Sequence, residues 1–481
     1  MMLIQGALVL RPRTFAAERL DVLIEGDTIR DLVPPGSVKG EGMERVEASG
    51  RALMPGLVNG HNHAQANLSK GLFDRYTLEL YLNAVPWATG RRTLEDKKLS
   101  ALIGAAEMAR KGCTAGYDMF AEFPLPSSEG VAGVAEAYAQ VGLRAAIAPM
   151  MADKSFYEAI PGLADALPEP LRSDALKARY APHAESIAAC RRILAEWRHS
   201  RDVIRPALGP TIPHHCTDDF LRACRDLARE HDLGMQMHVG ESKPQALLAP
   251  KVYGKSLVAH LAELGLLNER FCVAHGVWLD DADRARLADA GASVSHNPGS
   301  NLKLGSGVAD MRRMIASGIN VAIGTDGTAC SDNLNAFEAM RLACYLSRVR
   351  DHPSEQWISA REALHAATEG GARALGFEKV GRIEKGWKAD LVFLDLAAFQ
   401  YVPLNDLAQQ IVFGEDGTGV ESVMAGGRFI VRERKVLGVD LARLRREAEE
   451  AVARLAAANR EAKVLSEKLA PYVGRYCTGL R

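Results

Sequence analysis

The chain has 481 residues, and its 47% hydrophobic and 25% charged content is that of a globular protein with a sizeable core. Its 59 Lys and Arg residues against 60 Asp and Glu residues give a net charge of −1, which excludes the basic field of a nucleic-acid-binding surface. Since no apolar run approaches the roughly 18 residues of a membrane span, we expect small-molecule chemistry without nucleic-acid or membrane partners. The eight cysteines are scattered without CxxC spacing, which predicts buried thiols in a reducing cytoplasm.

Strand patterns dominate both ends of the chain. Apolar runs alternate with turn residues in the first 50 positions, as in "LDVLIEGDTIRDLVPPG", and the same pattern returns over residues 381–438. We expect residues 1–54 and 376–438 to pair into a small β-sandwich that flanks a central domain. The tail, 439–481, is rich in Ala, Glu, Arg and Leu, and predicts a helical extension with a long helix over 440–469 that covers the central domain or a partner subunit.

The central part, residues 55–375, alternates short apolar strands with amphipathic helical patterns. Two of the helical stretches, "DDFLRACRDLAREH" and "DDADRARLADA", open with Asp near an N-cap position. Strand and helix alternation at this spacing is typical of βαβ units, and about eight strands are present. The predicted fold is therefore of the α/β class, a (β/α)₈ barrel. The strands are expected at "ALMPGLVNG", "CTAGYDM", "LRAAIAP", "VIRPALG", "LGMQMHV", "RFCVAHG", "GASVSHNP" and "INVAIGTDG".

Polar side chains stand where several of these strands should stop. His61 and His63 are one residue apart, so on a strand both rings point to the same face and can hold one cation. An isolated pair of this kind can also be two solvated histidines in a loop. Further along the chain, a histidine or an aspartate stands at the carboxyl end of four more predicted strands. The strand ends of a barrel converge on one rim, so these side chains should lie close together, and chance is a poor explanation for so many of them. These residues are His238, His275, His296 and Asp326.

Together, "PGLVNGHNH", "HVGE", "VAHG", "SHNPGSNLKLGSG", "IGTDG" and "GRIEKGWKADLVFLD" resemble the amidohydrolase superfamily, in particular its ATZ/TRZ branch of triazine hydrolases and S-adenosylhomocysteine or methylthioadenosine deaminases. The resemblance implies one divalent metal ion, Zn²⁺ or in some relatives Fe²⁺. Its ligands would be His61, His63, His238 and Asp326. It also implies three catalytic roles: Asp326 accepts a proton from the attacking water, His275 orients that water or polarises the leaving group, and Glu241 shuttles protons to the ring.

The expected function is hydrolytic deamination of a small aminopurine, pterin, pyrimidine or triazine, at a carbon–nitrogen bond other than a peptide bond. The alternative is a triazine-type chlorohydrolase or amine-releasing hydrolase with the same mononuclear site. An amide hydrolase with two metals bridged by a lysine is disfavoured, because 206–209 hold no lysine. A catalytically dead scaffold predicts lost ligands, and all are present. The resemblance also suggests a homo-oligomer.

Candidate substrate contacts lie in the segment after the metal pair, which resembles the family's lid and carries Glu79 and Trp87, and at Thr211, His296 and Ser331. Adenosine-type deaminases of the branch carry P-H-x-P-Y at the end of the fourth strand. Here the stretch is "GPTIPHHC", so Thr211 stands where that His would be, which argues against a nucleoside substrate. His296 is expected to shape the pocket wall, and Ser331 to hold Asp326 from behind.

Overall fold

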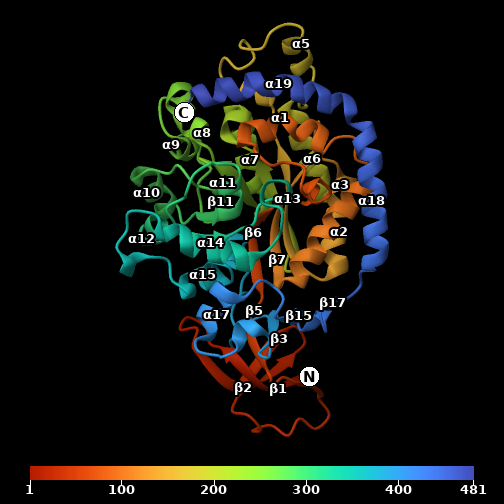
Figure 1. Ribbon diagram of the computed structural model, residues 1–481, viewed down its shortest axis with the longest axis vertical. Coiled ribbons are helices and arrows are strands. Elements are labelled where there is room, and N and C mark those ends of the chain that lie inside the picture. Colours follow the sequence, from red (N-terminus) through yellow and green to blue (C-terminus); the bar gives the residue numbers. More distant parts are fainter. Residues whose placement is uncertain (481) are drawn as a thin grey trace.

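Eight parallel strands form a barrel in the middle of the chain, and the fold class predicted from the sequence is confirmed (Figure 1). They lie in the order β13-β12-β11-β10-β9-β8-β7-β6, and each neighbouring pair is parallel. Apart from single residues, all eight strands are buried on both faces, as expected where helices cover the outside of a parallel sheet. The strands are β6 Leu57–Asn62, β7 Cys113–Ala121, β8 Arg144–Met151, β9 Ile204–Pro210, β10 Gly234–Val239, β11 Phe271–His275, β12 Ser293–His296 and β13 Asn320–Ile323. The computed structural model describes residues 1–480.

The first and last strands of the barrel meet just beyond the end of β13. The backbone N–H of Asp326 donates to the carbonyl of His61 at 2.9 Å, and the amide of Asn59 donates to the Thr325 hydroxyl at 2.7 Å. Gly60 lies against the neighbouring strands so closely that a Cβ there would come within 2.8 Å of the Ala322 Cβ. The absence of a side chain at this position therefore lets β6 close against β13.

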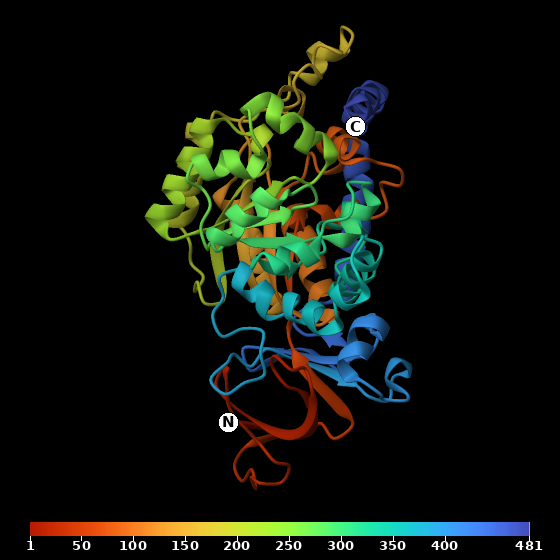
Figure 2. The ribbon, with the colours of Figure 1, turned by 90° about the vertical axis from the view of Figure 1, so that its left-hand side faces the viewer.

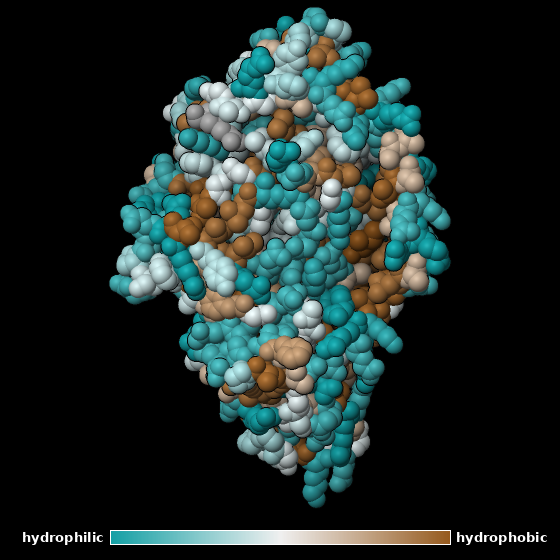
Figure 3. All heavy atoms as spheres, viewed as in Figure 1, coloured by the Kyte–Doolittle hydropathy of each residue, from teal (hydrophilic) through white to brown (hydrophobic). Residues whose placement is uncertain are grey.

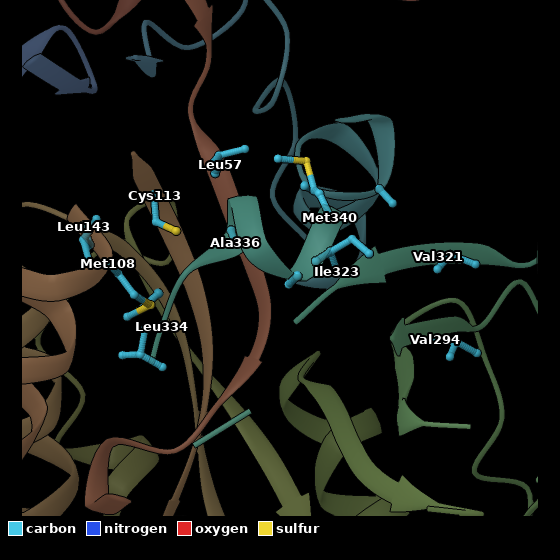
Figure 4. Close-up of a cluster of buried hydrophobic side chains, with 14 of the residues drawn as sticks. Leu57, Met108, Cys113, Leu143, Val294, Val321, Ile323, Leu334, Ala336 and Met340 are labelled. Atoms are coloured by element: carbon cyan, nitrogen blue, oxygen red, sulfur yellow. The ribbon is translucent and has the colours of Figure 1, made fainter. Parts of the chain in front are cut away.

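Helices surround the barrel, and the two stretches predicted from their opening Asp residues are among them. The two stretches that open with Asp form α7 and α10, capped by Thr217 and Asp280. Apolar side chains of α2 and α14 pack against the barrel strands in one buried cluster (Figure 4). The helices are α1 Leu78–Ala88, α2 Leu94–Arg110, α3 Ser128–Val141, α4 Phe156–Ala159, α5 Leu171–Ala175, α6 His183–Ala195, α7 Asp218–His231, α8 Lys243–Tyr253, α9 Leu257–Glu263, α10 Asp281–Asp289, α11 Pro298–Lys303, α12 Met311–Ala316, α13 Thr328–Ser331, α14 Ala336–Arg348, α15 Ala360–Ala366, α16 Glu369–Ala374, α17 Leu407–Gly414, α18 Leu441–Ala458 and α19 Arg460–Gly479, with 3₁₀ turns η1 Ala64–Ser69, η2 Pro213–His215, η3 Ser354–Gln356 and η4 Phe399–Tyr401.

Both ends of the chain build a second sheet below the barrel, as the sequence predicted. Its nine strands form one curved sheet around its own apolar core, and the antiparallel pair β5 and β14 joins the N-terminal part to the C-terminal part (Figure 2). The strands are β1 Met2–Leu10, β2 Ala17–Glu25, β3 Thr28–Val33, β4 Glu44–Glu47, β5 Arg51–Pro55, β14 Leu391–Asp395, β15 Val420–Ala425, β16 Arg428–Arg432 and β17 Lys435–Val436.

The tail forms two helices instead of the one expected over 440–469. The break falls at Asn459, whose side-chain amide donates to the carbonyls of Leu455 and Gly90, each at 3.0 Å. Beyond it α19 crosses the end of the barrel against α1 (Figure 1), where the Asn83 amide donates to the backbone and hydroxyl oxygens of Ser466, both at 3.0 Å. The tail therefore covers this chain's own barrel, including α1, the helix that follows His61 and His63 in the chain.

Hydrophobic residues on the face seen in Figure 3 lie in separate patches among hydrophilic ones. Within residues 1–480, no helix combines the length and the apolar character that a bilayer crossing requires.

Candidate metal centre and active site

Three histidine rings from two strands of the barrel meet at its carboxyl end. His61 lies in β6, His63 directly follows that strand, and His238 lies in β10. The ring centroids of His61 are 4.7 Å from His63 and 4.9 Å from His238. His61 and His63 point to one side, as their spacing predicted, and His238, 175 residues after His63, supplies the third ring.

The hydrogen bonds on the far side of each ring determine which nitrogen is free. The Nδ1 atoms of His63 and His238 lie 2.7 Å and 2.8 Å from the carbonyl oxygens of Met119 and Thr211. A carbonyl can only accept, so each Nδ1 carries the proton and each Nε2 presents a lone pair. These two Nε2 atoms are 3.3 Å apart, an unfavourable approach unless a cation lies between them.

Asp326 faces the same point from beyond β13. Its Oδ1 is 3.2 Å from the Nε2 of His63 and 3.5 Å from the Nε2 of His61, which has no hydrogen-bond partner although it is fully buried. The Ser300 hydroxyl donates to Asp326 Oδ2 at 2.6 Å and fixes the carboxylate. Asp326 has φ 63°, in the left-handed region that costs a non-glycine residue energy, a strain typical of functional sites.

The four side chains fit a divalent metal ion. The ligand atoms of His61, His63 and His238 form one close group, those of His61, His275 and Asp326 form a second, and His61 belongs to both. Imidazole nitrogens with a carboxylate oxygen suit zinc or iron, and each of the four predicted ligands is oriented by a second hydrogen bond behind it. The orphaned Nε2 of His61 is the observation that tests the fit, because a buried polar atom without a partner is costly in the absence of a ligand.

His275 and Glu241 stand beside this cluster. His275 ends β11 with φ 76°, and its Nδ1 is 2.8 Å from Asn301 Oδ1, which leaves Nε2 facing the site. That Nε2 lies 3.7 Å from Glu241 Oε1 and 3.8 Å from Asp326 Oδ2, with no hydrogen-bond partner of its own. His275 thus stands between two carboxyl groups at a spacing that leaves room for a bridging water or substrate atom.

The surroundings of Glu241 and Asp326 shift the pKa values of the two carboxyl groups in opposite directions. Burial, followed by the charges of Asp326 and Glu79, raises the pKa of Glu241 well above its ordinary value. Burial acts on Asp326 as well, but the imidazole rings of His61 and His63 beside the carboxylate outweigh burial and hold the Asp326 pKa well below its usual range. Burial lowers the pKa of His275 to about 4, so that ring is neutral near pH 7. The site therefore pairs a carboxyl group of raised pKa with one of lowered pKa.

The predicted substrate contacts fall in different surroundings. Glu79 and Thr211 are buried, and Glu79 lines a cavity together with His214, Ser242 and Gln245. The Thr211 backbone carbonyl holds both the N–H and the Nδ1 of His238, each at 2.8 Å, a role that its side chain does not reveal. Trp87 packs on Phe73, with ring centroids 5.5 Å apart, and beneath Lys463.

The other two predicted contacts lie behind the rim. His296 ends β12 and is buried, with its Nδ1 unpartnered among the residues described. The Ser331 hydroxyl donates to the Gly327 and Asn333 carbonyls, at 3.1 Å and 3.0 Å. The hydroxyl on Asp326 is that of Ser300 instead.

Sequence reasoning missed the residues that orient the ligands. Gln236 holds His61, Asn301 holds His275 and Ser300 holds Asp326. A signal existed for Gln236, because it stands two residues before His238 and so shares its face of β10. Ser300 and Asn301 lie in the quoted "SHNPGSN" motif, where only the fold shows which partner each one meets.

The amidohydrolase family model matches residues 52–430, and the chain belongs to this family. Among curated proteins, the chain is 32% identical over 415 residues to a 5'-deoxyadenosine deaminase of Methanosarcina mazei, covering 86% of this chain and 88% of that one. It is 30% identical over 439 residues to a 5-methylthioadenosine/S-adenosylhomocysteine deaminase of Pyrococcus abyssi, covering 91% and 95%.

Two solved structures share the fold. An adenosine deaminase from Xanthomonas campestris with bound zinc superposes with a TM-score of 0.83 at 28% identity, over 95% of this chain and 98% of that chain. A mutant of the atrazine chlorohydrolase TrzN from Arthrobacter aurescens TC1, complexed with zinc and atraton, gives 0.84 at 23% identity, over 94% and 100%. The second likeness is one of fold alone.

Proposed function

We propose that this protein is a metal-dependent hydrolytic deaminase of a small nitrogen heterocycle, with zinc as its metal and aminopurines of the adenosine type as its first substrate class. The observation that carries the proposal is the pairing of Glu241, whose pKa is raised, with Asp326, whose pKa is lowered, on either side of His275. Deamination needs such a pair, because a proton must leave the attacking water and another must reach the ring. The named deaminases among the relatives support the substrate class, against the expectation that the Thr211 position suggested.

The proposed roles follow from the geometry. His61, His63, His238 and Asp326 would hold the metal, which when bound lowers the pKa of water toward neutrality and so supplies hydroxide at physiological pH. Asp326 accepts the proton that the attacking water loses. Neutral His275 accepts a hydrogen bond from that water through its bare Nε2 and keeps the water aligned with the carbon under attack.

Glu241 acts on the other reactant. Its raised pKa favours the protonated carboxyl group, which donates a proton to the ring nitrogen next to the carbon under attack, and this makes the carbon more electrophilic. The two protons of the water then complete the reaction: the proton held by Asp326 passes to the departing amine, which leaves as ammonia, and the proton lost by the new hydroxyl restores the acid form of Glu241. The backbone N–H of Glu241 donates to Gln245 Oε1 at 3.0 Å, which fixes the position of this residue at the start of the loop.

Ammonia release by the zinc-loaded protein tests the proposal, across adenosine, guanine, pterin, cytosine and aminotriazine compounds. We expect release from the adenosine class and its loss in both His238→Ala and Glu241→Gln. Bound metal should be lost in the first variant and kept in the second. Silence across the whole panel with about one metal per chain would overturn the assignment of ammonia as the leaving group.

A further inference from the structure

A buried carboxylate that takes no part in the proposed reaction lies behind the first pair of predicted metal ligands. Asp118 is in β7, its side chain is fully buried, and among residues 1–480 it forms no ion pair. Burying a carboxylate without a cation beside it is costly. The groups that it bonds therefore indicate what its presence contributes.

The Asp118 side chain points away from the metal site, toward α3 on the outside of the barrel. Its neighbours Tyr117 and Met119 belong to an apolar cluster that joins β6, β7, β9, β11 and β13, and so lie inside the barrel. Successive side chains of a strand point to opposite faces, so Asp118 faces outward. There its Oδ2 accepts a hydrogen bond from the hydroxyl of Tyr138 in α3 at 2.7 Å. The carboxylate can act on the metal only through another residue.

That residue is His63. Asp118 Oδ1 accepts a hydrogen bond from the backbone N–H of Ala64, the residue after His63, at 2.9 Å. His63 is the N-cap of η1, the position whose side chain usually satisfies a free N–H at the start of a helix. Its ring makes no such bond, because Nδ1 bonds the Met119 carbonyl and Nε2 faces the metal site. Asp118 supplies the missing cap from the neighbouring strand.

Two further bonds join the same stretch of chain to β7. The Asn62 amide donates to the Tyr117 carbonyl at 2.8 Å, and Nδ1 of His63 donates to the Met119 carbonyl at 2.7 Å. Both acceptors are backbone oxygens, which stay in place whatever the side chain. The bond from Asp118 is the one in which β7 contributes a side chain, so a substitution can remove it and leave the other two.

We propose that Asp118 is a positioning residue for the metal ligand His63, and that Tyr138 orients Asp118 from α3. One carboxylate oxygen fixes the backbone directly after His63, the hydroxyl of Tyr138 fixes the other oxygen, and the imidazole ring is thereby presented to the metal at one angle. The inference rests on the metal site of the proposed function but not on deamination, so zinc affinity tests it without a substrate.

Competition with a zinc chelator measures this affinity. Asp118→Ala should weaken zinc binding by about 10- to 100-fold, the usual effect of losing a group that orients a ligand. Asp118→Asn should keep most of the affinity. Its amide oxygen can still accept from Ala64, and its amide nitrogen can donate to the Tyr138 oxygen. The Tyr138 hydroxyl can then donate to Asn62 Oδ1, 3.3 Å away.

Two buried tyrosines provide a matched pair of variants. Tyr138→Phe should weaken zinc binding by about 5-fold, the contribution of one ordinary hydrogen bond. Tyr117→Phe should leave zinc affinity unchanged, because the Tyr117 hydroxyl has no hydrogen-bond partner among the described residues. Urea titration of each metal-free variant measures its unfolding free energy separately. A merely structural role for Asp118 would lower that free energy and leave the zinc affinity of the folded protein unchanged.

The outcomes are distinct. Equal zinc affinity in folded Asp118→Ala and the wild-type protein overturns the proposal, and so does a loss in Asp118→Asn as large as in Asp118→Ala. If Asp118→Ala does not fold, the tyrosine variants decide: weaker binding in Tyr138→Phe alone supports the proposal, and equal affinity in Tyr138→Phe and Tyr117→Phe overturns it. A wild-type protein that binds no zinc overturns the metal site and this inference together. Zinc binding without ammonia release overturns the deamination alone.

Discussion

The side-chain oxygen of Gln236 lies 2.7 Å from Nδ1 of His61, and the amide nitrogen of the same residue donates to the Gly60 carbonyl at 2.9 Å. The second bond fixes which end of the amide faces the ring, because a carbonyl can only accept. Nδ1 of His61 therefore carries its proton, and Nε2 offers a lone pair to the metal. One buried amide thus decides the tautomer of the most deeply buried ligand.

Replacing Gln236 by Leu should weaken metal binding by about 10- to 100-fold, the usual effect of losing a hydrogen bond behind a ligand. His61 would then choose between two tautomers, only one of which binds. Competition with a zinc chelator measures the change. Cys272→Ala is the control, because the Cys272 sulfur contacts the same amide at 3.3 Å without touching His61. Equal zinc affinity in Gln236→Leu and the wild-type protein would refute this role.

Glu241→Gln should lower kcat by about 10²- to 10⁴-fold, the range for loss of a general acid. Metal content should not change, because Glu241 contributes no atom to the two clusters of ligand atoms. Ammonia assays and metal analysis of the same preparation measure both quantities. Loss of the metal together with activity would place Glu241 among the ligands and remove it from proton transfer.

The basic side of the pH profile should respond to Glu79. Glu241 must be protonated to donate, so kcat falls as pH rises through its pKa, which burial and then the charges of Asp326 and Glu79 raise. Glu79→Gln removes one of these charges, favours the ionised form of Glu241, and should move the fall in kcat to lower pH. Glu263→Gln, at an exposed ion pair with Lys255, should leave the profile in place. A shift to higher pH in Glu79→Gln would contradict this account.

Acid should destabilise the fold partly through His214. Its pKa is about 4 in the folded protein and 6.5 in the unfolded chain. Below pH 6.5 the unfolded chain therefore binds a proton that the folded one does not, and stability falls with pH until about pH 4. His214→Phe should reduce the loss of unfolding free energy between pH 6.5 and 4.5 by about 2 kcal/mol.

Urea titrations of the metal-free proteins at several pH values measure this loss. His199→Phe, on a half-buried surface ring, serves as the control for the loss of a histidine. If His214→Phe and the wild-type protein lose the same unfolding free energy, His214 has the same pKa in the folded and the unfolded chain, and this account is wrong.

The sequence predicted the barrel and the ligands for the same physical reason. Buried parallel strands are continuous apolar runs, so a polar residue where a run stops, such as His238 or Asp326, is conspicuous and falls on the functional rim. Those ligands remain predictions until a metal is measured, but the structure brings them together.

The groups that orient the ligands could not be predicted from the sequence, because their partners are brought together only by folding. The Thr211 carbonyl that holds His238 is backbone, so no residue type reports it. The cavity of Glu79, His214 and Gln245 joins three elements whose relative positions exist only in the folded chain. The break at Asn459 depends on the carbonyl of Gly90, 369 residues away, so no local pattern marks it.

The contact between α1 and α19 has a consequence for biosynthesis. The helix that carries Glu79 is made early, yet Ser466, which braces it through Asn83, is made 383 residues after Asn83. We therefore expect a nascent chain to close its barrel before its substrate pocket acquires an outer wall. A premature stop codon after residue 459 would then yield a protein that folds and binds metal while its specificity is lost.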